Sequence, residues 1–292
     1  MVLLTALVLS LSAGCAGAAI LSLLPQADVG ATRAVRRELG RSATFRRLVR
    51  DRVTPGVATG LGLTVALLGV VVTGVLFGVL VYLIRRNAGV LAWDVWVAHW
   101  AADHASLFST RVLEFVTNLG STAAIVVIAV SAAVHGVLRW RRVSVVLYLA
   151  LVAVGQLVIV TLIKTAVDRV RPAIDPLAGF SGASFPSGHS TAAAATFAAI
   201  ALVVGRGRAP KARAVLGGLA IAIAVAVGCS RMFLGVHWFS DVLAGWALGW
   251  AWFGICTVAF GGRFLRFGAP AEVITRAPRA GQAHPGRETT PG

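Results

Sequence analysis

The sequence predicts an all-α integral membrane protein, and three observations support this fold class. Of the 292 residues, 58% are hydrophobic and only 13% are charged. Apolar runs recur along the chain, and several are about as long as a helix that crosses a bilayer core. Basic residues lie in short segments between these runs, where they are expected to determine membrane topology. Together these features rule out a soluble protein.

Seven apolar stretches are predicted to form the membrane helices. The first has no positively charged start of the kind that a secretory signal carries, so we expect an additional N-terminal membrane helix there. A removed signal segment is the alternative. The seven stretches lie near residues 1–25, 57–84, 121–138, 143–163, 188–205, 213–229 and 238–260.

Arginine-bearing segments predict which helix ends face the cytoplasm. The connections near 139–142 and 206–213 are basic, as are the segment 26–56 and the tail 261–292. Under the positive-inside rule these four regions are cytoplasmic. The tail is also rich in Pro, Gly and Thr, so we expect it to be disordered. The other connections then share the extracytoplasmic side; they are residues 85–120, 164–187 and 230–237.

The net charge of +16 does not by itself indicate nucleic-acid binding. The basic residues are dispersed between apolar runs instead of being gathered on one exposed domain, so no nucleic-acid partner is predicted. The three cysteines lie in or beside apolar runs and have the spacing of neither a disulfide framework nor a zinc site.

The extracytoplasmic segment 85–120 predicts a helix at the level of the lipid headgroups. Trp93, Trp96 and Trp100 recur there at helical spacing, and tryptophan is enriched at membrane–water interfaces. His99 and His104 lie in the same segment, but their five-residue separation does not put them squarely on one helix face. We therefore predict neither a metal site nor a cofactor.

Two extracytoplasmic loops hold polar groups that are costly to place beside hydrocarbon, which suggests one polar site made from both. Lys164 and Arg171 belong to the first loop and Arg231 to the second. Three cations would repel one another in an empty, partly buried site. Their convergence therefore favours an anion such as phosphate, whose oxygens match the forked donors of arginine.

The end of the first loop predicts the start of an anion-binding helix. Ser187 suits the N-cap of a helix that begins near His189, and the free backbone N–H groups at that end would bind an anion. Gly188 would let the backbone approach a phosphate closely.

Two histidines and one aspartate provide the chemistry of phosphoryl transfer. His237 and Asp241 are four residues apart, so in a helix they would share one face. Asp241 would then accept the Nδ1 proton and leave Nε2 of His237 able to attack phosphorus. His189 is the candidate general acid for the leaving oxygen, and later the base for water. The fixed cations would neutralise the phosphoryl charge without a metal.

These residues resemble the three motifs of the type 2 phosphatidic acid phosphatase (PAP2) superfamily, which includes lipid phosphate phosphatases and shares its site with vanadium haloperoxidases. The motifs are K-x6-R-P, P-S-G-H and S-R-x5-H-x3-D. They match, in this order, Lys164 to Arg171-Pro172, Pro186-Ser187-Gly188-His189, and Ser230-Arg231 through His237 to Asp241.

The resemblance implies a core of six transmembrane helices within a phosphatase domain at 57–260, with the helix at 1–25 outside it. It implies that His237 is the nucleophile, assisted by Asp241, and that the site lies at the outer membrane face. It also implies phosphate contacts by Lys164, Arg171, Ser187, Gly188, His189 and Arg231.

The expected activity is hydrolysis of a lipid phosphate or pyrophosphate in the bilayer, such as phosphatidic acid, phosphatidylglycerol phosphate or a polyprenyl pyrophosphate. Two alternatives remain open: a phosphotransferase that uses an alcohol acceptor, and a transporter or binding protein that only holds anionic lipids. A vanadate-dependent haloperoxidase is disfavoured because those relatives are soluble. The sequence determines neither the lipid nor the oligomeric state.

Overall fold

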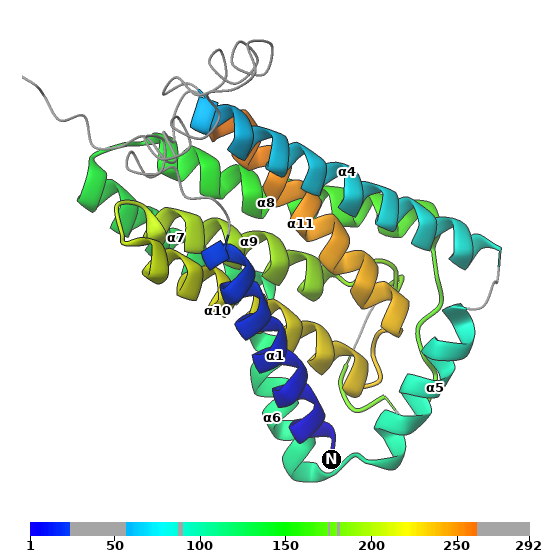
Figure 1. Cartoon of the computed structure of the whole chain (residues 1–292). Helices are drawn as coiled ribbons and strands as arrows, with labels where there is room; N and C mark the ends of the chain where they lie inside the picture. The colour runs from blue at the N-terminus through cyan, green and yellow to red at the C-terminus, as the bar shows by residue number, and fades with distance from the viewer. Residues whose placement is uncertain (24–56, 87–89, 175, 180–181, 262–292) are drawn as a thin grey trace, which may run out of the picture.

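The computed structural model describes residues 1–23, 57–86, 90–174, 176–179 and 182–261, and these residues form nine α-helices (Figure 1). The arginine-rich segment 26–56 and the tail from 262 onward, for which we predicted cytoplasmic positions, lie outside the described residues. The helices are α1 (Val2–Leu23), α4 (Val57–Arg85), α5 (Val90–Asp103), α6 (Leu107–Asn118), α7 (Thr122–Trp140), α8 (Ser144–Val167), α9 (Gly188–Gly205), α10 (Pro210–Phe233) and α11 (Phe239–Gly261).

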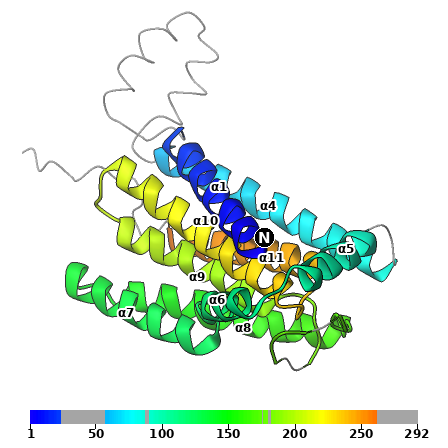
Figure 2. The same ribbon diagram turned by 90° about the horizontal axis from the view of Figure 1, so that it is seen from below.

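Seven of the described helices are long and apolar enough to cross a membrane: α1, α4 and α7 to α11. They correspond to the seven apolar stretches of the sequence, so the prediction of an all-α integral membrane protein is confirmed. Seen from below in Figure 2, α1 and α4 lie on one side of the bundle and α7 and α8 on the other, with α9, α10 and α11 between them.

Helix α9 is the most buried of these spans, because small side chains let its neighbours approach it. A Cβ atom added at Gly245 of α11 would lie 2.8 Å from the carbonyl oxygen of Ser187, and one at Gly249 would lie 2.6 Å from that of Thr191. Close approach through small residues is usual between membrane helices. This contact places the start of α11 directly beside the start of α9.

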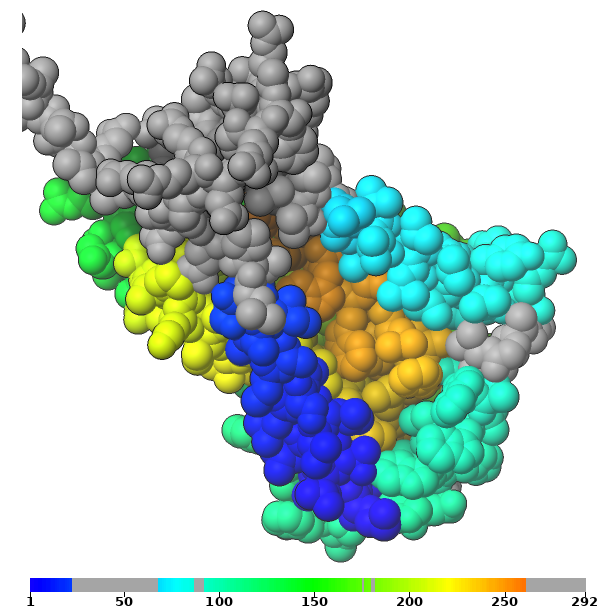
Figure 3. Space-filling view, viewed as in Figure 1, coloured from blue at the N-terminus to red at the C-terminus, as the bar shows by residue number. Residues whose placement is uncertain are grey.

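Helix α1, the additional N-terminal helix, packs along α10 through glycines of both helices. A Cβ atom added at Gly14 would lie 2.9 Å from the carbonyl oxygen of Gly218, and one at Gly218 would lie 2.5 Å from that of Gly14. On the face shown in Figure 3, α1 lies beside α10, and α11 is visible between α1 and α4. Helix α1 is therefore an integrated part of the described bundle.

The two ends of the bundle differ in the loops that they carry. At one end the Arg206 guanidinium lies over the ring of Trp140, at 5.5 Å, so the two basic loops predicted to share a membrane side lie together. At the other end the segment after α8 contacts the segment before α11, since Arg171 donates a hydrogen bond to the carbonyl of Val236. The predicted site loops therefore meet at the end opposite the basic loops.

The segment predicted as one interfacial helix consists of two, α5 and α6, at the site end of the bundle (Figure 1). They are separated by a turn in which Ser106 caps α6 through a capping box with Ser109. Trp93 and Trp96 of α5 are exposed, at 62% and 59%, whereas Trp100 packs against Phe233 of α10. One face of α5 thus points out of the bundle and the other packs onto the site.

Candidate active site

The first site segment begins where α8 ends. Asp168 takes a left-handed conformation, with φ 43°, and its backbone N–H bonds to the carbonyl of Lys164 to close the helix. The Lys164 ammonium, on the last turn, donates a hydrogen bond to the carbonyl of Ala183. That bond links the beginning of the segment to its end and holds the ammonium at the site end of the bundle.

Arg171 connects this segment to His237. Its Nε and Nη1 atoms donate hydrogen bonds to the carbonyls of Gly182 and Val236, at 2.9 and 2.7 Å. The same Nη1 lies 3.2 Å from Nε2 of His237. Because a guanidinium only donates, that Nε2 is the unprotonated ring nitrogen, and the ring proton belongs on Nδ1. Burial lowers the pKa of Arg171, and the charge of Asp241 acts in the opposite direction.

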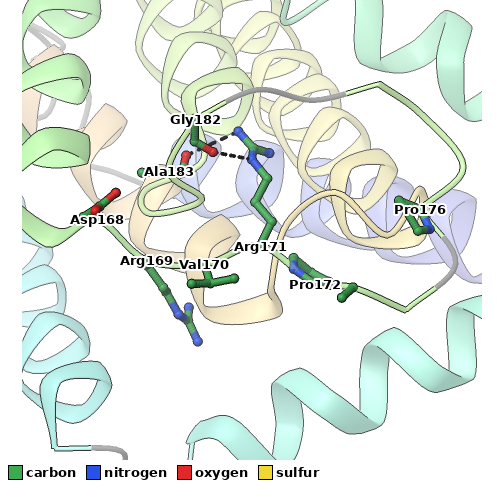
Figure 4. A pocket seen from close by; sticks show the side chains of 9 residues that line it. Asp168, Arg169, Val170, Arg171, Pro172, Pro176, Gly182 and Ala183 are labelled. Carbon is green, nitrogen blue, oxygen red and sulfur yellow. Dashed lines mark hydrogen bonds between the residues drawn. The ribbon is translucent and has the colours of Figure 1, made fainter.

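Figure 4 shows a hollow beside Arg171, with a cavity volume of about 590 Å³. Residues 168–173 line one part of it, and Pro176, Gly182 and Ala183 line another. The dashed lines in the figure mark the hydrogen bonds from Arg171 to the carbonyls of Gly182 and Ala183. Arg169, two residues earlier, points away from Arg171.

Arg231 reaches the site from the last turn of α10. Its Nη1 donates a hydrogen bond to Oγ1 of Thr117 on α6, at 3.2 Å, while its buried Nε has no hydrogen-bond partner among the described residues. A buried guanidinium with an unused donor is suited to bind an anion. Thr117 was not identified from the sequence, because a threonine in an amphipathic helix carries no motif.

The P-S-G-H residues form the predicted start of α9. The side chain of Ser187 is the N-cap and accepts a hydrogen bond from the backbone N–H of Ser190. His189 lies in the first turn and interacts electrostatically with Lys164, Arg171, Arg231 and His237. A Cβ atom at Gly188 would approach only Val160, at 3.6 Å, so packing against protein atoms does not require glycine there.

His237 precedes α11 and Asp241 lies in its first turn, so the two do not share a helix face as the spacing predicted. They are nevertheless adjacent: Nδ1 of His237 is 3.5 Å from Oδ2 of Asp241. That distance is at the outer limit for a hydrogen bond, and Nδ1 has no closer acceptor among the described residues. The same Oδ2 accepts a hydrogen bond from the backbone N–H of Trp238, at 3.0 Å, which holds the carboxylate in place.

The imidazole of His237 is almost completely buried, and this burial determines its protonation. The pKa of His237 is lowered to about 4; burial is the largest cause, Asp241 opposes the shift, and the positive charges of Arg231 and Arg171 add to it. The ring is therefore neutral at pH 7. A neutral imidazole with its lone pair on Nε2 is the form that can act as a nucleophile.

Three further residues form a polar group behind Asp241 that the motifs do not include. Arg169 donates from Nη1 to Oδ1 of Asp241, at 2.5 Å, and from Nη2 to Oδ2 of Asp94 on α5, at 2.7 Å. Ser240 donates to Asp94 from both its backbone N–H and its hydroxyl, at 2.8 and 2.7 Å. The sequence indicates Asp94 only as a charged residue among tryptophans, and Arg169 only as one member of the loop.

The structure thus brings together, at one end of a membrane bundle, the cations, the helix start and both histidines that the sequence indicated. This arrangement defines a class of integral membrane protein with a buried, neutral histidine facing cations suited to an oxyanion. The family model of the PAP2 superfamily matches residues 144–264 of this chain. The match begins at α8 and includes all three motifs.

Part of the chain is also similar to curated phosphatases. The chain is 45% identical over 89 residues to phosphatidylglycerophosphatase B of Bacillus subtilis, covering 30% of this chain and 44% of that protein. It is 38% identical over 120 residues to lipid A 1-phosphatase of Rhizobium johnstonii, covering 38% of this chain and 45% of the relative. The chain therefore spans less than half of the length of these curated relatives.

A solved structure extends the likeness beyond the segment matched by the family model. The crystal structure of a transmembrane PAP2 type phosphatidylglycerolphosphate phosphatase from Bacillus subtilis superposes with a TM-score of 0.63 and 29% sequence identity. The likeness covers 98% of that chain and 68% of this one. The six-helix membrane core implied by the motifs is thus found in the tertiary structure as well.

Proposed function

We propose that this protein is a membrane phosphatase that removes phosphate from a phosphorylated lipid through a phosphohistidine on His237. One observation carries the proposal. Nε2 of the buried, neutral His237 is held as a hydrogen-bond acceptor by Arg171, and Asp241 stands behind Nδ1. Attack on a phosphate requires a lone pair on the ring, a cation beside that lone pair and a carboxylate behind the ring.

In the first step, Nε2 of His237 attacks phosphorus, and the bond from phosphorus to the lipid oxygen breaks. His189 gives its proton to that oxygen, so the lipid leaves as an alcohol, or as a lipid phosphate if the substrate is a pyrophosphate. The positive charge that forms on the imidazole is stabilised by Asp241. When phosphate binds, the Nη1 donor of Arg171 turns from Nε2 to a phosphoryl oxygen.

In the second step, water attacks the phosphohistidine and the bond from phosphorus to Nε2 breaks. His189, now neutral, takes a proton from the water, and inorganic phosphate leaves with His237 restored. The phosphoryl oxygens are balanced in both steps by Lys164, Arg171 and Arg231, together with the free N–H groups at the start of α9 that follow Ser187 and Gly188.

The site faces the extracytoplasmic side, and residues 57–260 form the phosphatase domain. The support for the side is the separation of the site from the loops 139–142 and 206–213, whose arginines favour the cytoplasm. The support for the domain is that α4 packs against the site: Leu80 and Ile84 lie in one buried cluster with Phe185 and Ala244.

The substrate is a lipid whose phosphate sits at the headgroup level. The relatives named above act, by their names, on phosphatidylglycerol phosphate and on the 1-phosphate of lipid A, which differ in their lipid parts and share an anionic phosphate. We propose phosphatidylglycerol phosphate as the first substrate to test, since the matched crystal structure is a phosphatase for that lipid and superposes over nearly its full length.

The experiment measures inorganic phosphate released by the purified full-length chain in detergent micelles. Phosphatidylglycerol phosphate, phosphatidic acid, a polyprenyl pyrophosphate and lipid A are supplied in turn. At least one lipid is expected to release phosphate, and His237→Ala is expected to abolish this release. Phosphate release by the folded His237→Ala protein at the parent rate would contradict the phosphohistidine mechanism, whereas no release from any lipid by the parent chain would favour a chain that only binds anions.

Two controls separate related activities. Adding glycerol as an acceptor should leave phosphate release unchanged, because water is the acceptor. A fall in free phosphate with phosphorylation of glycerol would instead indicate a phosphotransferase. EDTA should leave activity unchanged as well, since the cations that meet the phosphate are side chains; loss of activity with the chelator would overturn that part of the mechanism.

A further inference from the structure

The buried ion-pair chain behind Asp241 suggests that the site extends beyond the three motifs. Arg169 lies between two carboxylates, Asp241 and Asp94, and all three side chains are at most 9% exposed. Burying such charges is costly unless they are paired, and a chain of this kind persists only when its geometry is good. Here each contact is a short charge-assisted hydrogen bond.

The charges of this ion-pair chain determine how strongly Asp241 can stabilise a positive charge on the imidazole of His237. Arg169 alone would neutralise Asp241, and the carboxylate could then do little for a positive charge on the imidazole. Asp94 restores the balance, because two carboxylates against one guanidinium leave one negative charge in excess. That excess stands where the imidazole becomes positive, and at short range in a buried site it is weakly screened.

The position of the ion-pair chain at the start of α11 matters as much as its charge, because it holds Asp241 in place. Oδ1 of Asp94 accepts from the backbone N–H of Ser240, which is one of the first N–H groups of α11 and has no partner within that helix. Asp94 thus caps α11 from a different helix. Asp241, the next residue, has its Oδ1 held by Arg169 and its Oδ2 turned toward His237.

We propose that Asp94 is a positioning residue for the His237–Asp241 pair, acting through Arg169 and the start of α11. This inference rests on the proposed function, since it assigns a role within the same site. Asp94 restrains the guanidinium so that Arg169 orients Asp241 without cancelling the charge that the imidazole needs. Helix α5, which precedes the matched family segment, therefore contributes to the chemistry.

The test begins with Asp94→Asn in the full-length chain. This substitution keeps an oxygen to cap Ser240, removes the negative charge and replaces the oxygen that accepts from Arg169 by an amide NH2 group. We expect kcat for the active lipid to fall about tenfold, the scale seen when an outer partner of a site histidine is lost. KM should change less than about twofold, because Lys164, Arg171 and Arg231 are untouched. Asp103→Asn, an exposed residue of the same helix, is the matched control and should behave as the parent.

A second variant separates charge balance from loss of structure. Asp94→Asn/Arg169→Gln removes one negative and one positive charge, so Asp241 again supplies one net negative charge. The glutamine amide keeps an N–H that can donate to Asp241 in place of the guanidinium, so the orientation of the carboxylate is retained. We expect its kcat to return to within about threefold of the parent, since the charge beside the imidazole is restored. A kcat no higher than that of Asp94→Asn would overturn the proposal, as would an Asp94→Asn protein with the parent kcat. If Asp94→Asn alone fails to fold, the double variant is compared with the parent: a kcat within about threefold supports the proposal, and a kcat lower by about tenfold or more overturns it.

Measuring the binding of two anions, orthovanadate and inorganic phosphate, tests the role of Asp94 separately from the proposed function. If the parent chain releases no phosphate from any lipid, the proposed function fails, and orthovanadate then tests Asp94 without turnover. Orthovanadate bonds to an attacking nitrogen and mimics the transition state, whereas inorganic phosphate is held by the cations alone. Asp94→Asn should weaken orthovanadate binding about tenfold and phosphate binding by less than about threefold. Equal weakening of both would contradict the positioning role.

Discussion

Nη1 of Arg171 lies 3.2 Å from Nε2 of His237 and donates to it, so the proposed nucleophile is held by a proposed phosphate-binding residue. The same Nη1 donates to the carbonyl of Val236, one residue before His237. This pair fixes the tautomer of the imidazole and keeps its lone pair directed at the cations. The predictions below follow from this relationship and from the packing around it.

Arg171→Lys is expected to lower kcat/KM by about 100-fold, on the scale of losing one positioned donor to the transition state. A lysine keeps the charge but cannot contact two carbonyls and the imidazole through a planar fork. Steady-state phosphate release from micelles measures the effect. Arg111→Lys, at an exposed position of α6, is the control and should retain full activity. A lysine variant with parent kcat/KM would show that charge alone is needed at position 171.

The pH dependence should reflect the lowered pKa of His237. That pKa is about 4 against an ordinary value of 6.5, with burial as the largest cause. The neutral, attacking form therefore persists as the pH falls through 6.5, and kcat/KM, corrected for ionisation of the substrate, should decline only near pH 4. An acid limb centred at 6.5 would contradict this expectation. His135→Asn, on the exposed side of α7, should leave the profile unchanged.

The lowered pKa of His237 also makes the stability of the folded protein depend on pH. Between pH 6.5 and about pH 4 the unfolded chain binds a proton at His237 that the folded chain does not bind. The contribution of His237 to stability is therefore fully present above pH 6.5 and decreases as the pH falls through this window. The thermal transition of the parent should fall more than that of His237→Gln over the same range. An equal fall in both proteins would assign the pH dependence to other groups.

Gly188→Ala is expected to lower activity without lowering stability. The added Cβ would meet only Val160 at 3.6 Å, an ordinary contact, so the thermal transition should remain that of the parent. A bound phosphate would meet the methyl group at the start of α9, and kcat/KM should fall about 100-fold, the scale expected for a displacement of 1 Å. Unchanged activity would show that the phosphate does not approach the backbone here.

Gly245→Val tests the contact between α11 and α9. Its Cβ would lie 2.8 Å from the carbonyl oxygen of Ser187, which is backbone and cannot turn away. The start of α11 must then shift, with a fall of about 5 °C in the thermal transition and loss of most activity. Gly74→Val is the control and should change neither quantity, because a Cβ added at this position of α4 would meet no atom of another described segment within 4 Å.

Thr117→Val removes the acceptor that holds Arg231 and keeps the shape of the side chain. The guanidinium should become less well oriented, and KM should rise about fivefold, on the scale of about 1 kcal/mol for one hydrogen bond. Thr110→Val, at a half-buried position of the same helix, should leave KM unchanged. A parent-like KM in Thr117→Val would show that Arg231 is oriented by other contacts.

Most of the fold could be predicted from the sequence because a membrane imposes one simple requirement. Each apolar stretch must be a helix of about the thickness of the bilayer, so hydropathy alone located all seven spans. The interfacial segment was harder to predict. Its break between α5 and α6 depends on the capping box of Ser106 and Ser109, a local signal too short to be recognised among so many apolar residues.

The site was predictable in part for a similar reason. His237, His189 and the three cations are polar groups at the ends of apolar helices, and such groups are conspicuous in a membrane protein. The spacing of His237 and Asp241 indicated a pair but suggested the wrong local geometry. His237 lies before α11, and its ring meets the carboxylate from a turn that ends at the helix start.

The sequence by itself determined the membrane helices, and it predicted which connecting loops share an end of the bundle and which residues would act on a phosphate. Only the tertiary structure decided that Asp94 and Arg169 stand behind Asp241. The physical reason is that Arg169 and Asp94 are 75 residues apart, and their pairing follows from how α5 packs onto the end of the bundle. No periodicity or short motif encodes such a contact, because it exists only once the helices are assembled.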